Sequence, residues 1–189
     1  NVSLPMDVTL RIGGVQLEQG SFSTSFIPTT SSVLTRSADS FSFPISSWFN
    51  ASESTLYGRA STAGINSAST IADINNNAFS ERFQIRFASN FTYSGIITTA
   101  NTVQSSFSGG TTTANTQNKL AMSATANDGV LYANGTLRSS DSSISMPTAQ
   151  TQMRVGGVAS GSERLNGHLQ NIKYYPKRIL NTQLQLLTQ

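Results

Sequence analysis

The chain contains no cysteine and carries little charge. Without cysteine, disulfide bonds and thiolate metal sites cannot form, so the fold depends on burial and hydrogen bonding. Charged residues make up 11% of the 189 residues, against about a quarter in an average protein, whereas Ser, Thr and Asn together supply roughly a third. This composition predicts a surface dominated by hydroxyl and amide groups rather than by ion pairs.

Other absences exclude whole classes of function. No apolar run approaches the ~18 residues of a membrane-spanning helix. The net charge is only +3 and the twelve Lys and Arg residues are scattered singly, which does not predict a nucleic-acid interface but is compatible with an acidic glycan. His168 is the single histidine, so a poly-histidine metal site is excluded, and no Gly-x-Ser-x-Gly motif exists to hold a catalytic serine.

Glycoside hydrolysis requires two carboxyl groups that flank the scissile bond, about 5 Å or about 6.5–9.5 Å apart. The nine acidic residues are isolated along the sequence, and only folding can bring a pair together. The acids available for such a pair are Glu53, Asp73, Glu81, Asp128, Asp141 and Glu163. The sequence therefore favours a protein that is not an enzyme, and we assign no catalytic residue.

The chain does contain a regular succession of short apolar alternations. Strand-like runs lie at residues 7–12, 54–60, 83–88 and 95–100. Strands of this length recur at roughly ten-residue spacing, without an amphipathic stretch long enough for an ordinary helix. This rhythm predicts an all-β protein, an antiparallel β-sandwich.

Three glycine-containing segments predict turns or loops. Asn134-Gly135 lies between two strand-like runs and predicts a two-residue type I′ hairpin, because both central residues of that turn need positive φ. Gly109-Gly110, followed by three threonines, predicts a polar loop. Residues 153–157 predict a strand that ends in a glycine turn.

The end of the chain, residues 165–188, combines several signals. Asn166-Gly167 predicts a turn, which is followed by a strand with Ile172 and Tyr174 on one face. Pro176 ends this strand because proline cannot donate to a continuing ladder. A single helical turn is then expected, with Asn181 as its N-cap and with Leu184 and Leu187 on its apolar side.

This ending resembles the close of the concanavalin A-like (laminin G-like) lectin/glucanase sandwich found in bacteriophage tail fibres and tailspikes. The hairpin at residues 131–135 resembles one that recurs in laminin G-like sandwiches, and residues 16–29 resemble a connector between modules of phage tail proteins. The resemblance implies that residues 1–33 are the end of an upstream module and a linker. It implies that residues 34–189 form a concanavalin A-like jelly roll with a short C-terminal helical turn. Since the chain begins at Asn1 without Met, we expect it to be a piece of a longer polypeptide.

The resemblance also implies a function. It points to a non-catalytic domain of a phage tail fibre or tailspike that binds a bacterial surface polysaccharide for host recognition. Such a domain would belong to the virion, form a homotrimer and contact other tail proteins. Two alternatives stay open: a structural spacer or trimer clamp without a ligand, and a glycan depolymerase. The Glu-x-Asp-x-x-Glu motif of the glucanases of this fold class is absent here, which argues against the depolymerase.

Sugar binding usually combines an aromatic face with amide or carboxylate groups. The available aromatic platforms are Phe91, Tyr93, Tyr132, Tyr174 and Tyr175. We select Tyr93 as the best candidate because Asn90 and Ser94 flank it in an expected loop. Tyr132 and Asn134, beside the hairpin turn, are further candidates.

Asp73, Asn75 and Asn77 place three side-chain oxygens at alternate positions, which is the opening spacing of a calcium loop. The match then ends, since Ala78 stands where the loop needs Gly and Gln84 stands where it needs Glu. The sequence therefore favours an Asn-rich β-turn over a calcium site, and no cofactor is predicted. Calcium stays open as an alternative, because the resemblance implies a fold class that often carries calcium between its loops.

Overall fold

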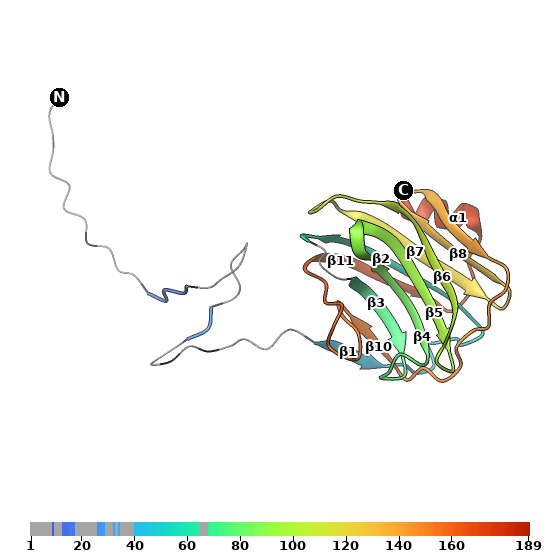
Figure 1. Ribbon diagram of the computed structural model, residues 1–189, viewed down its shortest axis with the longest axis horizontal. Coiled ribbons are helices and arrows are strands. Elements are labelled where there is room, and N and C mark those ends of the chain that lie inside the picture. The colour runs from blue at the N-terminus through green and yellow to red at the C-terminus, as the bar shows by residue number, and fades with distance from the viewer. Residues whose placement is uncertain are drawn as a thin grey trace, which may run out of the picture. The chain divides into compact units, whose positions relative to one another are not determined.

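The computed structural model describes residues 40–64 and 68–189, together with residues 9, 13–17, 26–28, 32 and 34 (Figure 1). The chain divides into two units, Asn1–Asp39 and Ser40–Gln189. In the first unit the backbone N–H of Ile27 donates to Oε1 of Gln16 at 2.7 Å. Most of the strand expected at residues 7–12 and of the connector at 16–29 lies outside the described residues.

The second unit is an antiparallel β-sandwich, which confirms the predicted fold class (Figure 1). The larger sheet has the order β1 (Phe41–Pro44), β10 (Gln152–Val155), β3 (Ser69–Asn75), β4 (Arg82–Phe87), β5 (Thr92–Thr99) and β6 (Thr102–Thr111). The smaller sheet has the order β11 (Gly167–Tyr175), β2 (Glu53–Thr62), β7 (Asn118–Thr125), β8 (Asp128–Ala133) and β9 (Thr136–Asp141). A 3₁₀ turn, Ser89–Phe91, and helix α1, Asn181–Thr188, complete the described elements. No helix among these residues is long and apolar enough to cross a membrane.

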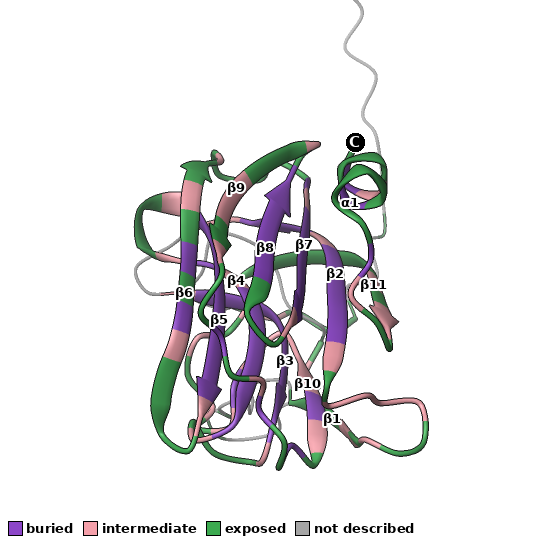
Figure 2. Cartoon of the chain, turned by 90° about the vertical axis from the view of Figure 1, so that its right-hand side faces the viewer, coloured by how far each residue is buried: buried purple, intermediate pink, exposed green. Residues whose placement is uncertain are grey.

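The core lies between the two sheets. Alternation along β4 directs Phe83, Ile85 and Phe87 inward, where they meet Leu56 of β2 and Met122 of β7 in one apolar cluster. Figure 2 shows the result: β2, β3, β7 and β8 are largely buried, whereas β11 and much of α1 are exposed. Burial of this apolar surface is the main source of stability in a chain without disulfides.

The Asn134-Gly135 hairpin is confirmed between β8 and β9, with φ of 49° and 73° at its two central residues. The polar loop predicted at residues 109–113 is wrong for its first part, because Gly109 and Gly110 belong to β6, but Thr112 and Thr113 do lie in the connection between β6 and β7. A Cβ on Gly109 would lie 2.7 Å from the carbonyl oxygen of Arg138 on β9. The glycine therefore reflects close approach of two strands rather than a loop.

The C-terminal elements follow the sequence in outline but differ in two details. Gly167 opens β11 rather than a turn, and a Cβ there would lie 2.0 Å from the carbonyl oxygen of Ser61, so close backbone approach requires the glycine. Helix α1 is N-capped by Leu180 rather than by Asn181, whose side chain instead accepts a hydrogen bond from Arg178 at 2.7 Å. Leu184 is fully buried, as the apolar side of this helix predicts.

Candidate functional site

Polar side chains occupy the outer face of the six-stranded sheet. Because Phe83, Ile85 and Phe87 point into the core, Arg82, Gln84 and Arg86 point outward. The strand register places the outward residues of β3, β4 and β10 beside one another. We call this array the polar face; its residues are Thr70, Asp73, Asn75, Arg82, Gln84, Arg86, Gln152 and Arg154.

Glu163 reaches onto the polar face from the loop that joins β10 to β11. One oxygen of its carboxylate accepts hydrogen bonds from Thr70 Oγ1 at 3.0 Å and Gln84 Nε2 at 2.9 Å. The second oxygen accepts a hydrogen bond from Arg86 Nη1 at 2.8 Å. Arg82 Nη2 lies 3.6 Å from the oxygen to which Thr70 and Gln84 donate. Burial alone would raise the pKa of Glu163, but the Gln84 hydrogen bond, the Arg86 and Arg82 charges and the Thr70 hydrogen bond together lower it.

Asp73 lies deeper in the same face and is 0% exposed. Its carboxyl group is 3.7 Å from Arg82 Nε and accepts a hydrogen bond from Asn75 Nδ2 at 2.8 Å. Burial raises the pKa of Asp73 to about 6, although the Arg82 charge and the Asn75 hydrogen bond oppose this rise. The polar face thus holds two carboxyl groups whose pKa values are shifted in opposite directions.

The turn between β3 and β4 gives the polar face an exposed aromatic ring. Phe79 is 43% exposed, and its ring centroid lies 4.7 Å from the guanidinium carbon of Arg82. In the same turn Asn77 is exposed and accepts hydrogen bonds from Gln152 Nε2 at 3.0 Å and Arg154 Nη2 at 2.8 Å. An aromatic ring, an amide and guanidinium groups are therefore neighbours at this edge.

Several buried atoms of the polar face have no hydrogen-bond partner in the protein. They are Asp73 Oδ1, Arg82 Nε, Arg82 Nη2, Gln84 Oε1, Arg86 Nε and Arg154 Nε. Buried polar atoms in proteins are nearly always hydrogen-bonded, so their concentration on one face needs an explanation. Ion pairing accounts for three of them, because Arg82 Nε lies 3.7 Å from Asp73 Oδ1 and Arg82 Nη2 lies 3.6 Å from Glu163 Oε2.

The structure corrects the choice of Tyr93 as a sugar platform. Tyr93 lies on β5, not in a loop, and is 2% exposed, with its ring packed against Phe87. Its hydroxyl donates to Asn118 Oδ1 at 2.7 Å and accepts from Asn134 Nδ2 at 3.0 Å. A ring buried in this way has no free face for a sugar.

The other sequence-based sugar candidates lie apart from the polar face. Tyr132 is 7% exposed and belongs to the cluster beneath α1. Asn134 is exposed, but its amide supports the hairpin through bonds to Tyr93, Asn118 and Lys119. Asn90 is exposed in the 3₁₀ turn, with φ of 58°.

The calcium spacing at Asp73, Asn75 and Asn77 does not form a loop. Asp73 and Asn75 lie on β3, and only Asn77 belongs to the turn that follows. Protein donors occupy the side-chain oxygens of Asn75 and Asn77, since Gln152 Nε2 donates to both, at 3.1 and 3.0 Å, and one oxygen of Asp73 accepts from Asn75 Nδ2 at 2.8 Å. Among the described residues, no group of three or more His, Cys, Asp and Glu side chains gathers where it could hold a metal.

An aromatic groove of about 460 Å³ is a second surface feature. It lies between the sheet edges formed by β1 and β11, and its lining comprises Phe41, Phe43, Trp48, Met153, Val155, Leu169, Gln170, Asn171, Ile172 and Tyr174. Trp48 and Tyr174 pack edge to face with centroids 5.0 Å apart. Besides the Trp48 indole and the Tyr174 hydroxyl, which is hydrogen-bonded to Asn50 and Ser54, its polar side chains are those of Gln170 and Asn171.

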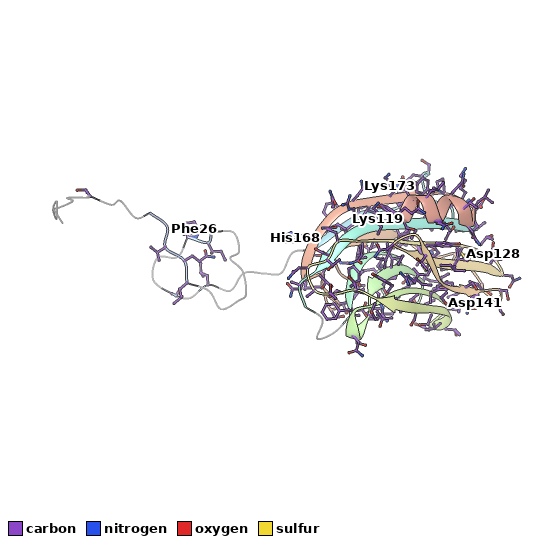
Figure 3. All side chains as sticks on the ribbon, turned by 90° about the horizontal axis from the view of Figure 1, so that it is seen from above. Phe26, Lys119, Asp128, Asp141, His168 and Lys173 are labelled. Atoms are coloured by element: carbon purple, nitrogen blue, oxygen red, sulfur yellow. The ribbon has the colours of Figure 1, made fainter. Side chains whose placement is uncertain are left out.

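The arrangement of acids does not suit hydrolysis. Asp73 and Glu163 are brought together, but Arg82 pairs with both of them and Asp73 is 0% exposed. A substrate would therefore have no direct access to the acid with the raised pKa. In Figure 3, His168 lies at one end of the sandwich and Asp128 and Asp141 at the other, so the single histidine is not combined with these acids.

The site residues that sequence reasoning missed are Phe79, Arg82, Arg86 and Glu163. Two arginines four positions apart on a strand whose alternate residues are Phe, Ile and Phe indicate a charged face opposite the core. This alternation could have identified Arg82 and Arg86 from the sequence. Glu163 follows a glycine-rich loop and carries no local signal, because its role arises only when the loop folds over β3 and β4.

No protein-family model matches the sequence, and the comparison with curated proteins finds no match either. Solved structures do share the fold. The CBM40 of the Ruminococcus gnavus IT-sialidase, bound to α2,3-sialyllactose, matches with a TM-score of 0.65 and 14% identity, over 74% of this chain and 84% of that chain.

Two further structures extend this similarity beyond sialidases. Domain 4 of AbnA, a GH43 extracellular arabinanase from Geobacillus stearothermophilus in complex with arabinotriose, matches with a TM-score of 0.59 and 12% identity, over 74% of this chain and 68% of that chain. A heptameric SAP-like pentraxin from Limulus polyphemus matches with a TM-score of 0.57 and 12% identity, over 71% and 69%. At these identities the comparison establishes the fold, a jelly-roll sandwich that fits the concanavalin A-like lectin class.

Proposed function

We propose that Ser40–Gln189 is a glycan-binding domain that performs no catalysis and binds its ligand at the exposed rim of the polar face, formed by Asn77, Phe79 and Arg154, because Thr70, Asp73, Asn75 and Gln84 are 0% exposed. The observation that carries the proposal is this exposed rim, where the ring of Phe79, 43% exposed, adjoins the amide of Asn77 and the guanidinium group of Arg154. The structural neighbours add support, because CBM40 is a carbohydrate-binding module and AbnA domain 4 is a complex with arabinotriose.

The geometry suggests how a sugar binds. The apolar side of a pyranose ring stacks on Phe79, and Asn77 and Arg154 at the same edge hydrogen-bond its hydroxyl groups. Each such bond replaces a bond to water, so its net contribution is about 0.5–1.5 kcal/mol. A single site is therefore weak, and several copies in an oligomer raise the apparent affinity through effective concentration.

We further propose that the domain belongs to a phage tail fibre or tailspike in the virion, where it binds a bacterial surface polysaccharide during host recognition. Support comes from the resemblance of the C-terminal segment, residues 165–188, and of the connector at residues 16–29 to segments of phage tail proteins. The same similarity suggests a homotrimer that contacts other tail proteins, which light scattering on the intact parent protein would test. Absence of any glycan binding would favour the structural alternative, a spacer or trimer clamp.

The proposed site is tested with two variants of the full chain, Phe79→Ala and Phe41→Ala, against a panel of bacterial surface polysaccharides. Both rings are exposed, 43% and 62%, but Phe79 adjoins the polar face and Phe41 lines the aromatic groove. We expect Phe79→Ala to weaken binding by roughly tenfold, about 1.4 kcal/mol, with Phe41→Ala close to wild type. The opposite pattern would place the glycan in the aromatic groove.

A further inference from the structure

Glu163 occupies a site built for a carboxylate. We propose that the ligand of the polar face is an acidic glycan whose carboxylate replaces that of Glu163, so that the side chain of Glu163 competes with the ligand. This inference rests on the proposed function and names the substrate class: a sugar with a carboxylate, such as a uronic or sialic acid. We call Thr70, Arg82, Gln84 and Arg86 the carboxylate site.

The carboxylate site surrounds Glu163 with donors from two strands. A hydroxyl, an amide and a guanidinium donate to its two oxygens at 2.8–3.0 Å, and a second guanidinium lies 3.6 Å away. Paired guanidinium and carboxylate groups form strong, charge-assisted hydrogen bonds. The same donors lower the pKa of Glu163, and they would favour the ionised form of any carboxylate placed there.

The residue that fills the site belongs to a loop that is anchored to β3, because the Glu163 carbonyl oxygen accepts a hydrogen bond from the Thr70 N–H at 2.8 Å. The Glu163 side chain, rather than the loop, would therefore turn away to admit a ligand. The loop contains Gly156 with φ of 72° and Gly161 with φ of 74°. Glu163 itself has φ of 49°, a conformation that costs a residue with a side chain of order 1 kcal/mol or more. Its side chain is 20% exposed, so the carboxylate lies at the edge of the protein rather than deep inside it.

Charge balance explains why the ligand should be acidic. Removing Glu163 from the site leaves Arg82 and Arg86, with side chains 8% and 18% exposed, without this counter-ion. Arg82 keeps its ion pair with Asp73, but Arg86 loses the carboxylate with which it pairs, and a neutral sugar does not relieve the cost of that largely buried charge. A ligand carboxylate does, because it restores the charge and the hydrogen bonds that Glu163 supplied.

The test measures binding of 3′-sialyllactose, a trigalacturonate and neutral lactose to the full chain by titration calorimetry. Glu163→Ala and Glu163→Gln remove the competing carboxylate. We expect both variants to bind at least one acidic probe about tenfold more tightly than the wild type does, without a comparable gain for lactose. Arg86→Ala in the Glu163→Gln background should abolish that gain.

Asp128→Asn is the matched control. It removes the same single charge from a carboxylate that pairs with Arg178 instead, at 3.1 Å, and whose side chain is 55% exposed. Equal gains in Asp128→Asn and Glu163→Gln would reduce the effect to net charge and overturn the inference. Unchanged acidic-probe affinity in both folded Glu163 variants would also overturn it, even if polysaccharide binding remains sensitive to Phe79→Ala. If neither the wild type nor the Glu163 variants bind any glycan, polysaccharides included, the proposed function itself is refuted.

Discussion

At the residue scale, the polar face holds two carboxyl groups in different surroundings. The ionised form of Glu163 is stabilised, whereas the ionised form of Asp73 is destabilised. Glu163 lies among four donors at the surface, whereas Asp73 is fully buried and retains an oxygen without a hydrogen-bond partner. The difference follows from their surroundings, since burial dominates for Asp73 and donor groups dominate for Glu163. Both residues therefore make the stability of the domain depend on pH, with opposite signs.

The pH dependence of Asp73 gives the first prediction. Its pKa rises from 3.8 to about 6 on folding, so between these values the native state keeps a proton that the unfolded state has lost. The stabilisation from Asp73 is thus complete below pH 3.8 and is lost as pH rises through about 6, amounting to at most about 3 kcal/mol.

Urea unfolding of the wild type and Asp73→Asn at several pH values between 4 and 7 measures this contribution. The asparagine variant lacks the titration, so we expect its stability relative to the wild type to increase as pH rises from 4 to 6 and then to level off. Parallel stability curves across this range would show that Asp73 titrates normally.

Tyr93 gives the second prediction. Because its ring is in the core and its hydroxyl is hydrogen-bonded to Asn118, Tyr93→Ala should destabilise the domain by about 3–5 kcal/mol. Under conditions where the variant is still folded, its glycan affinity should match the wild type. Weaker glycan binding with an unchanged melting temperature would restore Tyr93 as a sugar platform.

At the element scale, the hairpin between β8 and β9 is the clearest link from sequence to structure. Gly135 adopts φ of 73°, which a β-branched residue tolerates poorly, so Gly135→Val should destabilise the domain by roughly 1–3 kcal/mol. Thr136→Val is the control, because Thr136 is the exposed first residue of β9 and accepts a β-branched side chain. Equal melting temperatures for the two variants would contradict the turn's requirement for glycine.

Elements whose signal is local were predictable from the sequence. The strands β2, β4 and β5 and the Asn134-Gly135 turn follow directly from alternation and turn chemistry. Gly109 and Gly167 misled the prediction because their role depends on a distant strand that approaches the backbone closely. Tyr93 was misplaced for a related reason, since assigning it to a loop missed the extension of β5 back to Thr92.

The sequence predicts only part of the polar face. Alternation along β4 identifies Arg82 and Arg86 as opposite to the core, but not which residues lie beside them. That information comes from pairing of β4 with β3 and of β3 with β10, which are separated by many residues in the chain. The contribution of Glu163 from an irregular loop is determined wholly by tertiary contacts.

At the scale of the whole molecule, the two acids of the polar face are not both open to a substrate. Arg82 forms ion pairs with both Asp73 and Glu163, and Asp73 is 0% exposed and therefore inaccessible to substrate. We therefore expect no release of reducing ends when the full chain is incubated with a polysaccharide that it binds. Release that is lost in Asp73→Asn would identify the domain as a depolymerase.

The central claim, that the polar face binds a glycan, is tested most directly by an NMR titration of the full chain with 3′-sialyllactose and with a bound polysaccharide fragment. We predict that amide shifts concentrate at Asn77 in the turn after β3, Gln84 on β4, Arg154 on β10 and Glu163 in the loop after β10. Shifts concentrated at Phe41, Leu169 and Ile172 would place the ligand in the aromatic groove, and that result would contradict the account.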